Sequence, residues 1–540
     1  MDTMNTRIAQ TTQSKGVHVS HRDAEFHHHH SHGPASHHPG HHHLLSVEGL
    51  GVSFEMYDPA ASFWTAPRVR SEAVRELTLS VHEGEVLAVV GASGSGKTVL
   101  ADALLGLYEP NAKATGRIWF DGEECDADAL ASLRGHGISL VPQSVSNLDP
   151  LMRVGEQVQG MPQGRTRVER ATDRVRRVAR QQELFAAYGL APEVADLYPH
   201  QLSGGMARRV LIMCALMDSP RLIIADEPTP GLDLDLAVHA LDDLRAFANR
   251  GGGVLLITHD LELALRAADR VAVFRDGTVV EETAVGSFDD PASLRHPFSR
   301  SLWHAMPEHG FASESGGTAL GGRGMRRDGD MQQDTAALEA RHLMFSYPGV
   351  QPLYKGLSLS VRPGERVALC ASSGTGKTTL CRLLAGYLQP SDGEVVVDGK
   401  PLAHFARTHA PLPVQLIWQH PEQAFDPRMR MVRSLAEAGD PEGRRGSMLR
   451  DRFGIRDEWF ARLPHELSGG ELMRFCLVRA LLARPRYLIC DESTAMLDAV
   501  TQAELWGVLI DLLAAEQMGL VFVSHSPTLV DRIATRCIEL

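Results

Sequence analysis

Two stretches of the chain carry glycine, lysine and hydroxyl residues at a spacing that binds phosphate. The first is Gly91-Ala-Ser-Gly-Ser-Gly-Lys97-Thr98, and the second is Ala371-Ser-Ser-Gly-Thr-Gly-Lys377-Thr378. Glycines let backbone N–H groups approach phosphate oxygens, the lysine neutralises charge on the β- and γ-phosphates, and the threonine hydroxyl reaches Mg²⁺. The expected ATP-binding residues are Gly91, Ser93, Gly94, Ser95, Gly96, Lys97 and Thr98 in the first copy, and Ala371, Ser373, Gly374, Thr375, Gly376, Lys377 and Thr378 in the second.

The flanking sequence supports this interpretation. Residues 86–90 are the apolar run Val-Leu-Ala-Val-Val, which predicts a buried strand, and residues 98–106 predict a helix. A phosphate-binding loop requires this order of strand, loop and helix. The alternative, a glycine-rich turn beside a surface lysine, does not account for both flanking elements.

Each half also contains an acidic pair at the end of an apolar strand. Leu222-Ile-Ile-Ala leads into Asp226 and Glu227, and Leu488-Ile-Cys leads into Asp491 and Glu492. The strand brings the aspartate to the Mg²⁺ side, and the glutamate after it is placed to polarise the attacking water. An acidic pair that merely caps the next segment is the alternative, and the duplication disfavours it.

The sequence Leu-Ser-Gly-Gly occurs twice, each time before an apolar helical pattern. Its serines and glycines are expected to supply a hydroxyl, close backbone approach and a helix N-terminus directed at phosphate. These residues are Ser203, Gly204 and Gly205 in the first copy and Ser468, Gly469 and Gly470 in the second. Because all the motifs recur in one order, the chain is a tandem duplication.

The elements that position these motifs predict an α/β fold. Short apolar runs alternate with helical patterns, as in two P-loop NTPase domains, each with a mainly parallel sheet covered by helices. Composition divides the chain further. We predict a disordered His-rich tail at 1–43, a first nucleotide-binding domain at 44–307, a Gly-rich linker at 308–335 and a second domain at 336–540.

Bulk properties exclude several classes of protein. The formal charge of -13 argues against a general nucleic-acid binder. The 7 cysteines form no C-x-x-C pair, which fits reduced thiols in the cytoplasm. Neither a signal peptide nor an apolar run long enough to span a bilayer is evident.

From about Ser46 to the end, the chain resembles the ATP-binding cassette (ABC) family, whose signature is Leu-Ser-Gly-Gly-Gln. The resemblance implies an antiparallel β subdomain and a helical subdomain in each half, and a head-to-tail sandwich in which each half completes the other's ATP site. One site would combine Lys97, Thr98, Asp226, Glu227 and His259 with Ser468 and Gly470; the other would combine Lys377, Thr378, Asp491, Glu492 and His525 with Ser203 and Gly205. We expect the pairing to be intramolecular, because both partners are in one chain.

Other roles come from the resemblance alone. His259 and His525 resemble the family's switch histidines and join Glu227 and Glu492 as expected catalytic residues. Gln143 and Gln419 resemble the glutamines that contact Mg²⁺, together with Thr98, Asp226, Thr378 and Asp491, and relay to a permease. Tyr347 resembles the aromatic that stacks on adenine, with Phe54 or Tyr57 as candidates in the first half.

Three positions depart from the family pattern. Ala371 stands where glycine is expected, and its Cβ restricts a tight turn, so the second site is expected to be the weaker one. Met206 and Glu471 replace the signature glutamine, with little loss expected, because the preceding serine and glycines make the phosphate contacts. We predict two competent sites.

Short segments resemble the subfamily that imports oligopeptides, dipeptides, nickel and metal-chelator complexes. They are Asn147-Leu-Asp-Pro150, Ala424-Phe-Asp-Pro427 and residues 296–307. The resemblance implies an ATPase on the cytoplasmic side of the inner membrane that works with two permease subunits and, indirectly, an external solute-binding protein. A soluble twin-cassette factor acting on ribosomes or DNA, or an exporter motor, is the alternative.

The tail is dense in histidine, and imidazoles at high density bind Ni²⁺, Zn²⁺ or Cu²⁺. The candidate ligands are His27, His28, His29, His30, His41, His42 and His43. A storage tract, a disordered segment without a function, or part of an expression tag are the alternatives.

Overall fold

The computed structural model describes residues 43–57, 67–92, 94–229, 232, 234–309, 337–349, 351–371, 375–407, 411–495 and 497–540. The predicted linker falls almost entirely outside these ranges. Of the predicted tail, only His43 is described. We call residues 43–309 the first half and residues 337–540 the second half.

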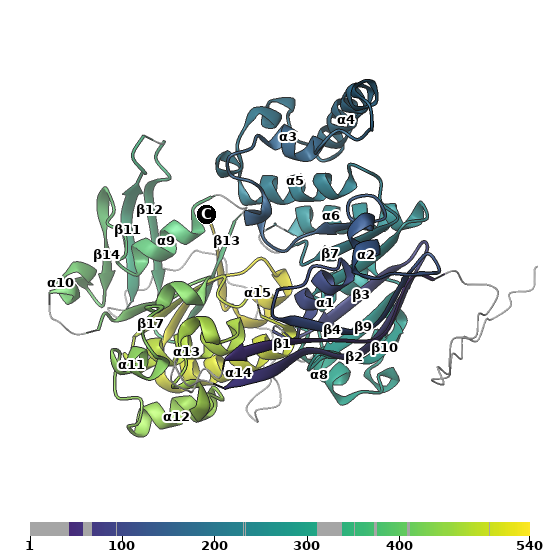
Figure 1. Cartoon of the computed structure of the whole chain (residues 1–540). Helices are drawn as coiled ribbons and strands as arrows, with labels where there is room; N and C mark the ends of the chain where they lie inside the picture. The colour runs from purple at the N-terminus through teal and green to yellow at the C-terminus, as the bar shows by residue number, and fades with distance from the viewer. Residues whose placement is uncertain are drawn as a thin grey trace, which may run out of the picture. The chain divides into compact units, whose positions relative to one another are not determined.

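The first half contains two sheets (Figure 1). The antiparallel sheet has the order β2 (Arg68–His82), β1 (His43–Tyr57), β4 (Ala112–Phe120), β5 (Glu123–Glu124). The second sheet, parallel except at its β10 edge, has the order β10 (Thr278–Ala284), β9 (Arg270–Arg275), β3 (Val86–Gly91), β8 (Gly253–Thr258), β7 (Leu222–Asp226), β6 (Ile138–Val141). Helices α1 (Lys97–Leu104), α2 (Ala127–Leu133), α6 (Leu234–Asn249), α7 (Leu261–Ala267) and α8 (Pro297–Ala305) accompany these sheets, and α3 (Val154–Gln159), α4 (Arg167–Ala187) and α5 (Gly204–Leu216) pack together as a helical subdomain.

The second half repeats this plan. Its antiparallel sheet is β12 (Tyr354–Val361), β11 (Leu338–Phe345), β14 (Asp392–Val397), β15 (Lys400–Pro401), and its parallel sheet is β16 (Val414–Ile417), β17 (Tyr487–Asp491), β18 (Gly519–Val523), β13 (Arg366–Cys370), β19 (Arg536–Glu539). The helices are α9 (Lys377–Leu384), α10 (Leu402–Ala406), α11 (Met431–Ala436), α12 (Arg444–Arg452), α13 (Gly469–Leu482), α14 (Ala499–Glu516) and α15 (Pro527–Ile533). The predicted α/β class, with its antiparallel and helical subdomains, is confirmed.

The strand that leads into the first phosphate loop is buried on both faces. Alternate residues of β3 point to opposite sides of the sheet, so Val86, Ala88 and Val90 join one core cluster. Leu87 and Val89 join the cluster shared with the antiparallel sheet. Because both faces are apolar, β3 reads in sequence as a continuous hydrophobic run.

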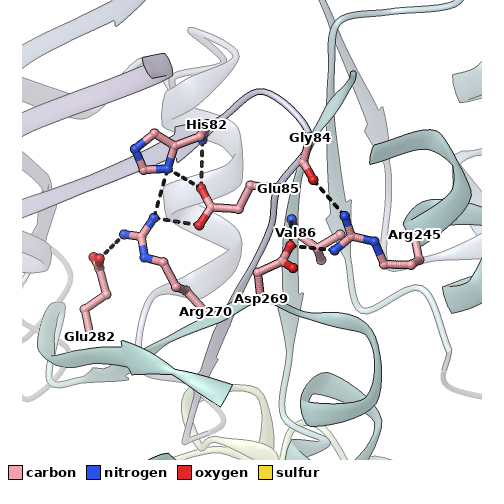
Figure 2. A network of polar contacts seen from close by, with 8 residues as sticks. All are labelled: His82, Gly84, Glu85, Val86, Arg245, Asp269, Arg270 and Glu282. Atoms are coloured by element: carbon pink, nitrogen blue, oxygen red, sulfur yellow. Dashed lines mark hydrogen bonds and ion pairs between the residues drawn. The ribbon is translucent and has the colours of Figure 1, made fainter. Parts of the chain in front are cut away.

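A polar network fixes the start of β3 (Figure 2). The Asp269 carboxylate accepts a hydrogen bond from the Val86 N–H at 2.8 Å and pairs with Arg245. Arg270 donates to Glu85 at 2.7 Å, and Glu85 also lies 2.6 Å from Nδ1 of His82. The network therefore holds the strand that carries the phosphate loop at the end opposite to the loop.

Two carbonyls that follow α8 contact the second half. Arg532 in α15 donates from Nε to the Pro307 carbonyl at 2.8 Å and from Nη2 to the Glu308 carbonyl at 3.2 Å. The last described residues of the first half are thus anchored on α15. Within the described ranges, no helix is both long enough and apolar enough to cross a membrane.

Candidate functional site

The first phosphate loop turns tightly between β3 and α1. Gly96 is the N-cap of α1 at φ 103°, a left-handed conformation that favours glycine. A Cβ at Gly91 would lie 2.0 Å from the Phe274 carbonyl oxygen, so only glycine fits there. Lys97 Nζ donates to the Gly91 carbonyl at 2.8 Å, and burial lowers the pKa of this lysine. Ser93 lies outside the described residues.

The second phosphate loop shares the features that are described. Gly376 is the N-cap of α9 at φ 100°, and its carbonyl accepts a hydrogen bond from the Tyr354 hydroxyl at 2.6 Å. Lys377 Nζ donates to the Ala371 carbonyl at 2.8 Å. Both lysines therefore lie over the loop that precedes them. Ser373 and Gly374 are not among the described residues.

The residues present fit a magnesium ion. Asp226 and Asp491 end β7 and β17, and each has a buried Oδ1 without a hydrogen-bond partner among the described residues. Burial raises the pKa of Asp226 to about 6 against the opposing hydrogen bond from Thr98; burial likewise raises that of Asp491, opposed by Thr378. A buried carboxylate oxygen beside a hydroxyl suits a hard cation, which prefers oxygen ligands.

In the first half, Glu227 meets the predicted histidine. His259 Nδ1 lies 2.8 Å from Glu227 Oε2, and the Thr258 hydroxyl lies 3.4 Å from the same oxygen. Burial by itself lowers the pKa of His259. The charge of Glu227 and its hydrogen bond act in the opposite direction and outweigh burial, so that the pKa is raised to about 9. The contact with Glu227 therefore favours the protonated, cationic form of His259.

The second half repeats the pair with one addition. His525 Nε2 lies 2.8 Å from Glu492 Oε1, and Gln419 donates to Glu492 Oε2 at 2.9 Å. Gln143, the matching glutamine of the first half, is exposed to solvent. The two predicted glutamines thus occupy different surroundings.

Both signature serines cap a helix. Ser203 begins α5 and accepts from the Met206 N–H, and Ser468 begins α13 and accepts from the Glu471 N–H, both at 3.3 Å. The Glu471 carboxylate in turn accepts a hydrogen bond from the Ser468 N–H at 2.9 Å, which completes a capping box. The glutamate that departs from the family signature therefore serves the helix start, a role that methionine cannot supply.

Contacts between the halves lie beside the first phosphate loop. A Cβ on Gly94 would lie 3.5 Å from the Ser468 Cβ, so this loop is next to the signature of the second half. His259 Nε2 also lies 3.1 Å from the Ala495 carbonyl oxygen. The first phosphate loop thus lies beside Ser468, one of the two signature residues predicted for the first composite site.

The remaining candidates are placed as follows. The half-exposed Tyr347 lies 3.1 Å from the Thr379 hydroxyl of α9, close to the second phosphate loop, and Phe54 lies in β1. Nothing is described of the Tyr57 side chain.

His43 opens β1, its ring 4.6 Å from His82, and the other tail histidines lie outside the described residues. Across the part of the chain that is described, no group of three or more His, Cys, Asp or Glu residues could hold a metal.

Sequence reasoning missed one buried residue beside the first site. Arg208, on α5, is 3% exposed and donates to the carbonyls of Pro142 and Glu227. Aligning the two signature helices shows that Met473 occupies the matching position, but this difference does not reveal which carbonyls Arg208 binds.

With this geometry established, the comparisons with known proteins decide the family. The ABC transporter family matches residues 74–230 and 354–495, one segment in each half. The chain belongs to this family. It is an ABC-type ATPase with two fused cassettes, which bind ATP, and the first and second halves are its two cassettes.

Curated relatives match almost the whole tandem chain. The glutathione import ATP-binding protein GsiA of Pectobacterium atrosepticum is 32% identical over 541 residues, which cover 91% of this chain and 84% of that protein. The protein of the same name in Escherichia coli K12 is 30% identical with the same coverage. The resemblance to the oligopeptide and dipeptide importer subfamily is confirmed.

Among solved structures, the likeness extends to proteins with other tasks. An archaeal ribosome recycling factor in complex with a ribosomal stalk protein has a TM-score of 0.58 at 21% identity, covering 86% of this chain and 84% of its own. A structure entitled RNase-L inhibitor has a TM-score of 0.56 at 20% identity, covering 86% and 85%. At these identities the likeness concerns the twin-cassette fold alone.

Proposed function

We propose that this chain is the ATP-hydrolysing subunit of an importer for small peptides of the glutathione type. The observation that carries the proposal is the match over 91% of the chain, both cassettes included, to proteins named for glutathione import. The alternative of a ribosome or DNA factor has only the fold in its favour. Nickel and metal-chelator complexes, the other cargoes of the subfamily, become outcomes of the transport experiment.

Two composite ATP sites would drive transport. In the first, Lys97 would neutralise the phosphates, Thr98 and Asp226 would hold Mg²⁺, and Glu227 would polarise the attacking water. The magnesium ion, when bound, would offset charge that develops on the transferred phosphoryl group. The proximity of Gly94 to Ser468 supports closure of this site by the signature of the second cassette.

The second site would use the matching residues Lys377, Thr378, Asp491 and Glu492, closed by the first signature. Its support is the repetition of the motifs and of the histidine pair, with His525 on Glu492 at 2.8 Å. Because each cassette would complete the other's site, one chain would contain both sites.

The permeases would dock beside the glutamine loops, at the cytoplasmic face of the inner membrane. In the second cassette, a groove of about 570 Å³ lies between β16 and α13. Gln415, Trp418, Gln423, Glu437 and Arg479 are among its lining residues. A short permease helix inserted there would contact the loop that carries Gln419, which in turn contacts Glu492.

Reconstituted transport tests this proposal. The chain would be placed in proteoliposomes with two permease subunits and a solute-binding protein identified by co-purification with it, and supplied with labelled glutathione, a dipeptide or Ni²⁺. We expect ATP-dependent glutathione uptake that is lost with Glu227→Gln and Glu492→Gln combined. Stimulation of ATPase activity by ribosomes but not by the permeases would contradict the proposal.

A further inference from the structure

The two cassettes satisfy the backbone of their glutamates in different ways. Glu227 and Glu492 both have left-handed backbones, with φ of 49° and 47°, a strained conformation for a residue with a Cβ. In the second cassette the Glu492 carbonyl accepts a hydrogen bond from the Ala495 N–H at 3.1 Å. Such a bond fixes the peptide that orients the glutamate side chain.

The first cassette cannot make the same bond. The sequence Asp226-Glu227-Pro-Thr-Pro230 matches Asp491-Glu492-Ser-Thr-Ala495, so Pro230 stands in the place of Ala495. Proline has no N–H to donate. The Glu227 carbonyl instead accepts from Arg208 Nη2 at 2.7 Å.

The same guanidinium reaches a second backbone segment. Arg208 Nη1 donates to the Pro142 carbonyl at 2.7 Å, one residue before Gln143. The position that matches Arg208 in the second cassette is Met473, which is 1% exposed and has no polar hydrogen to donate. Arginine and proline therefore occur together in the first cassette, and methionine and alanine in the second.

Burial gives this pair of bonds its strength. Arg208 is 3% exposed, and its Nε has no partner among the described residues. Burying a cation costs free energy unless opposite charges lie nearby. For Arg208 the Glu227 and Asp226 carboxylates supply these charges and stabilise the charged guanidinium. Its planar, forked guanidinium can hold two carbonyls at a fixed separation, which a single ammonium cannot do.

We propose that Arg208 is a positioning residue of the first ATP site: it replaces the N–H donor that Pro230 lacks and ties the Glu227 backbone to the Gln143 loop. Displacement of that loop by a docked partner would move Glu227 through one rigid side chain. In the second cassette the corresponding link is made by the Gln419 side chain. The proposal rests on the assignment of Glu227 as the residue that polarises water.

The test uses Arg208→Met in the full-length chain, which copies the second cassette. We expect kcat at saturating ATP to fall about twofold if the sites work independently and about tenfold or more if they act in turn, with the KM for ATP within about twofold of the wild type. Met473→Leu is the matched control and should leave kcat within about 20% of the wild-type value, so that even a twofold loss in Arg208→Met is distinguished from it.

Rescue separates positioning from general damage to the fold. Pro230→Ala restores the missing N–H, so the double variant Arg208→Met with Pro230→Ala should recover at least about half of the lost kcat. Arg208→Gln, a polar side chain that can reach only one carbonyl, provides a second comparison if thermal melting shows that Arg208→Met is unfolded.

The outcomes distinguish the two proposals. An unchanged kcat in a folded Arg208 variant, or a loss that Pro230→Ala does not relieve, would overturn the role of Arg208. Full activity in Glu227→Gln would instead overturn the assignment of the first site on which it rests.

Discussion

The two cassettes hold equivalent glutamates by different hydrogen bonds. Glu227 is held at its carbonyl by Arg208, whereas Glu492 is held at its carbonyl by the Ala495 N–H and at its carboxylate by Gln419. The left-handed backbone is the same in both. The backbone conformation of the glutamate is therefore the same in both cassettes, while the hydrogen-bond donor to its carbonyl differs. A substitution at one position, such as Pro230 for Ala495, must be interpreted together with the substitution that compensates for it, here Arg208 for Met473.

The glutamates allow the strongest test of how alike the cassettes are. Glu227→Gln and Glu492→Gln should each lower ATP turnover about 100-fold or more, because loss of a general base typically costs about 10²- to 10⁴-fold and coupled sites fail together. Phosphate release by each single variant measures this. Retention of half of the activity would show that the sites are independent.

The helical subdomains differ in the burial of the arginine that secures them. Arg177 on α4 is 3% exposed and lies 2.7 Å from Asp173 and 2.5 Å from Asp218. Arg445 on α12 pairs with Glu516 at 2.7 Å with a side chain that is 21% exposed. We expect Arg177→Met to lower the free energy of unfolding by about 2 kcal/mol, because Asp173 and Asp218 would keep only the exposed Arg176 as a cationic partner among the described residues, and Arg445→Met by about 1 kcal/mol.

Urea unfolding of both variants, followed against pH, would check this difference. A backbone hydrogen bond from Gln163 and then the bond to Arg177 lower the pKa of Asp173 from 3.8 to about 2. A depressed pKa contributes stability above pH 3.8, which is lost as the pH falls towards 2. Arg177→Met should weaken this pH dependence and Arg445→Met should leave it unchanged; equal effects would remove the distinction.

The phosphate loops differ at their first residue. Gly91→Ala places a Cβ 2.0 Å from the Phe274 carbonyl, and relief of the clash should cost about 1 to 3 kcal/mol of stability and weaken ATP binding. Ala371→Gly should change stability by less than about 1 kcal/mol. Thermal melting and binding of a fluorescent ATP analogue measure both. A larger effect from Ala371→Gly would reverse the comparison.

The smallest expected effect concerns the start of the phosphate-loop strand. Asp269 accepts the Val86 N–H at 2.8 Å, whereas in the second cassette the Thr535 hydroxyl accepts the Arg366 N–H at 2.9 Å. Asp269→Thr exchanges one acceptor for the other and gives up the partly exposed Arg245 pair, so we expect a loss of at most about 1 kcal/mol. Urea unfolding at low and high salt should show a smaller salt dependence than in the wild type; an unchanged dependence would contradict this account.

Sequence alone was sufficient where local pattern determines local structure. The strand and helix that flank each phosphate loop, the acidic strand ends and the helices after Leu-Ser-Gly-Gly lie where the motifs predict them. Glu471 was treated as a departure, although Ser468 three residues before it already had the spacing of a capping box.

Other features depend on tertiary contacts that no local pattern encodes. Arg208 bonds to backbone carbonyls 66 residues earlier and 19 residues later, so it resembles any other arginine on a helix until the strands are assembled. The contact of Gln419 with Glu492, 73 residues away, was hidden for the same reason. Every residue has a backbone carbonyl, so the sequence does not show which carbonyl a side chain binds.

The anchor of Arg532 on the Pro307 and Glu308 carbonyls bears on assembly. Two separate subunits would meet at their cellular concentrations, whereas two domains of one chain experience an effective concentration that can reach the millimolar range. Fusion also fixes the ratio of unlike cassettes at one to one. By binding the Pro307 and Glu308 carbonyls, Arg532 keeps the end of the first cassette next to the second, which favours partners in the same chain over those in a neighbouring molecule.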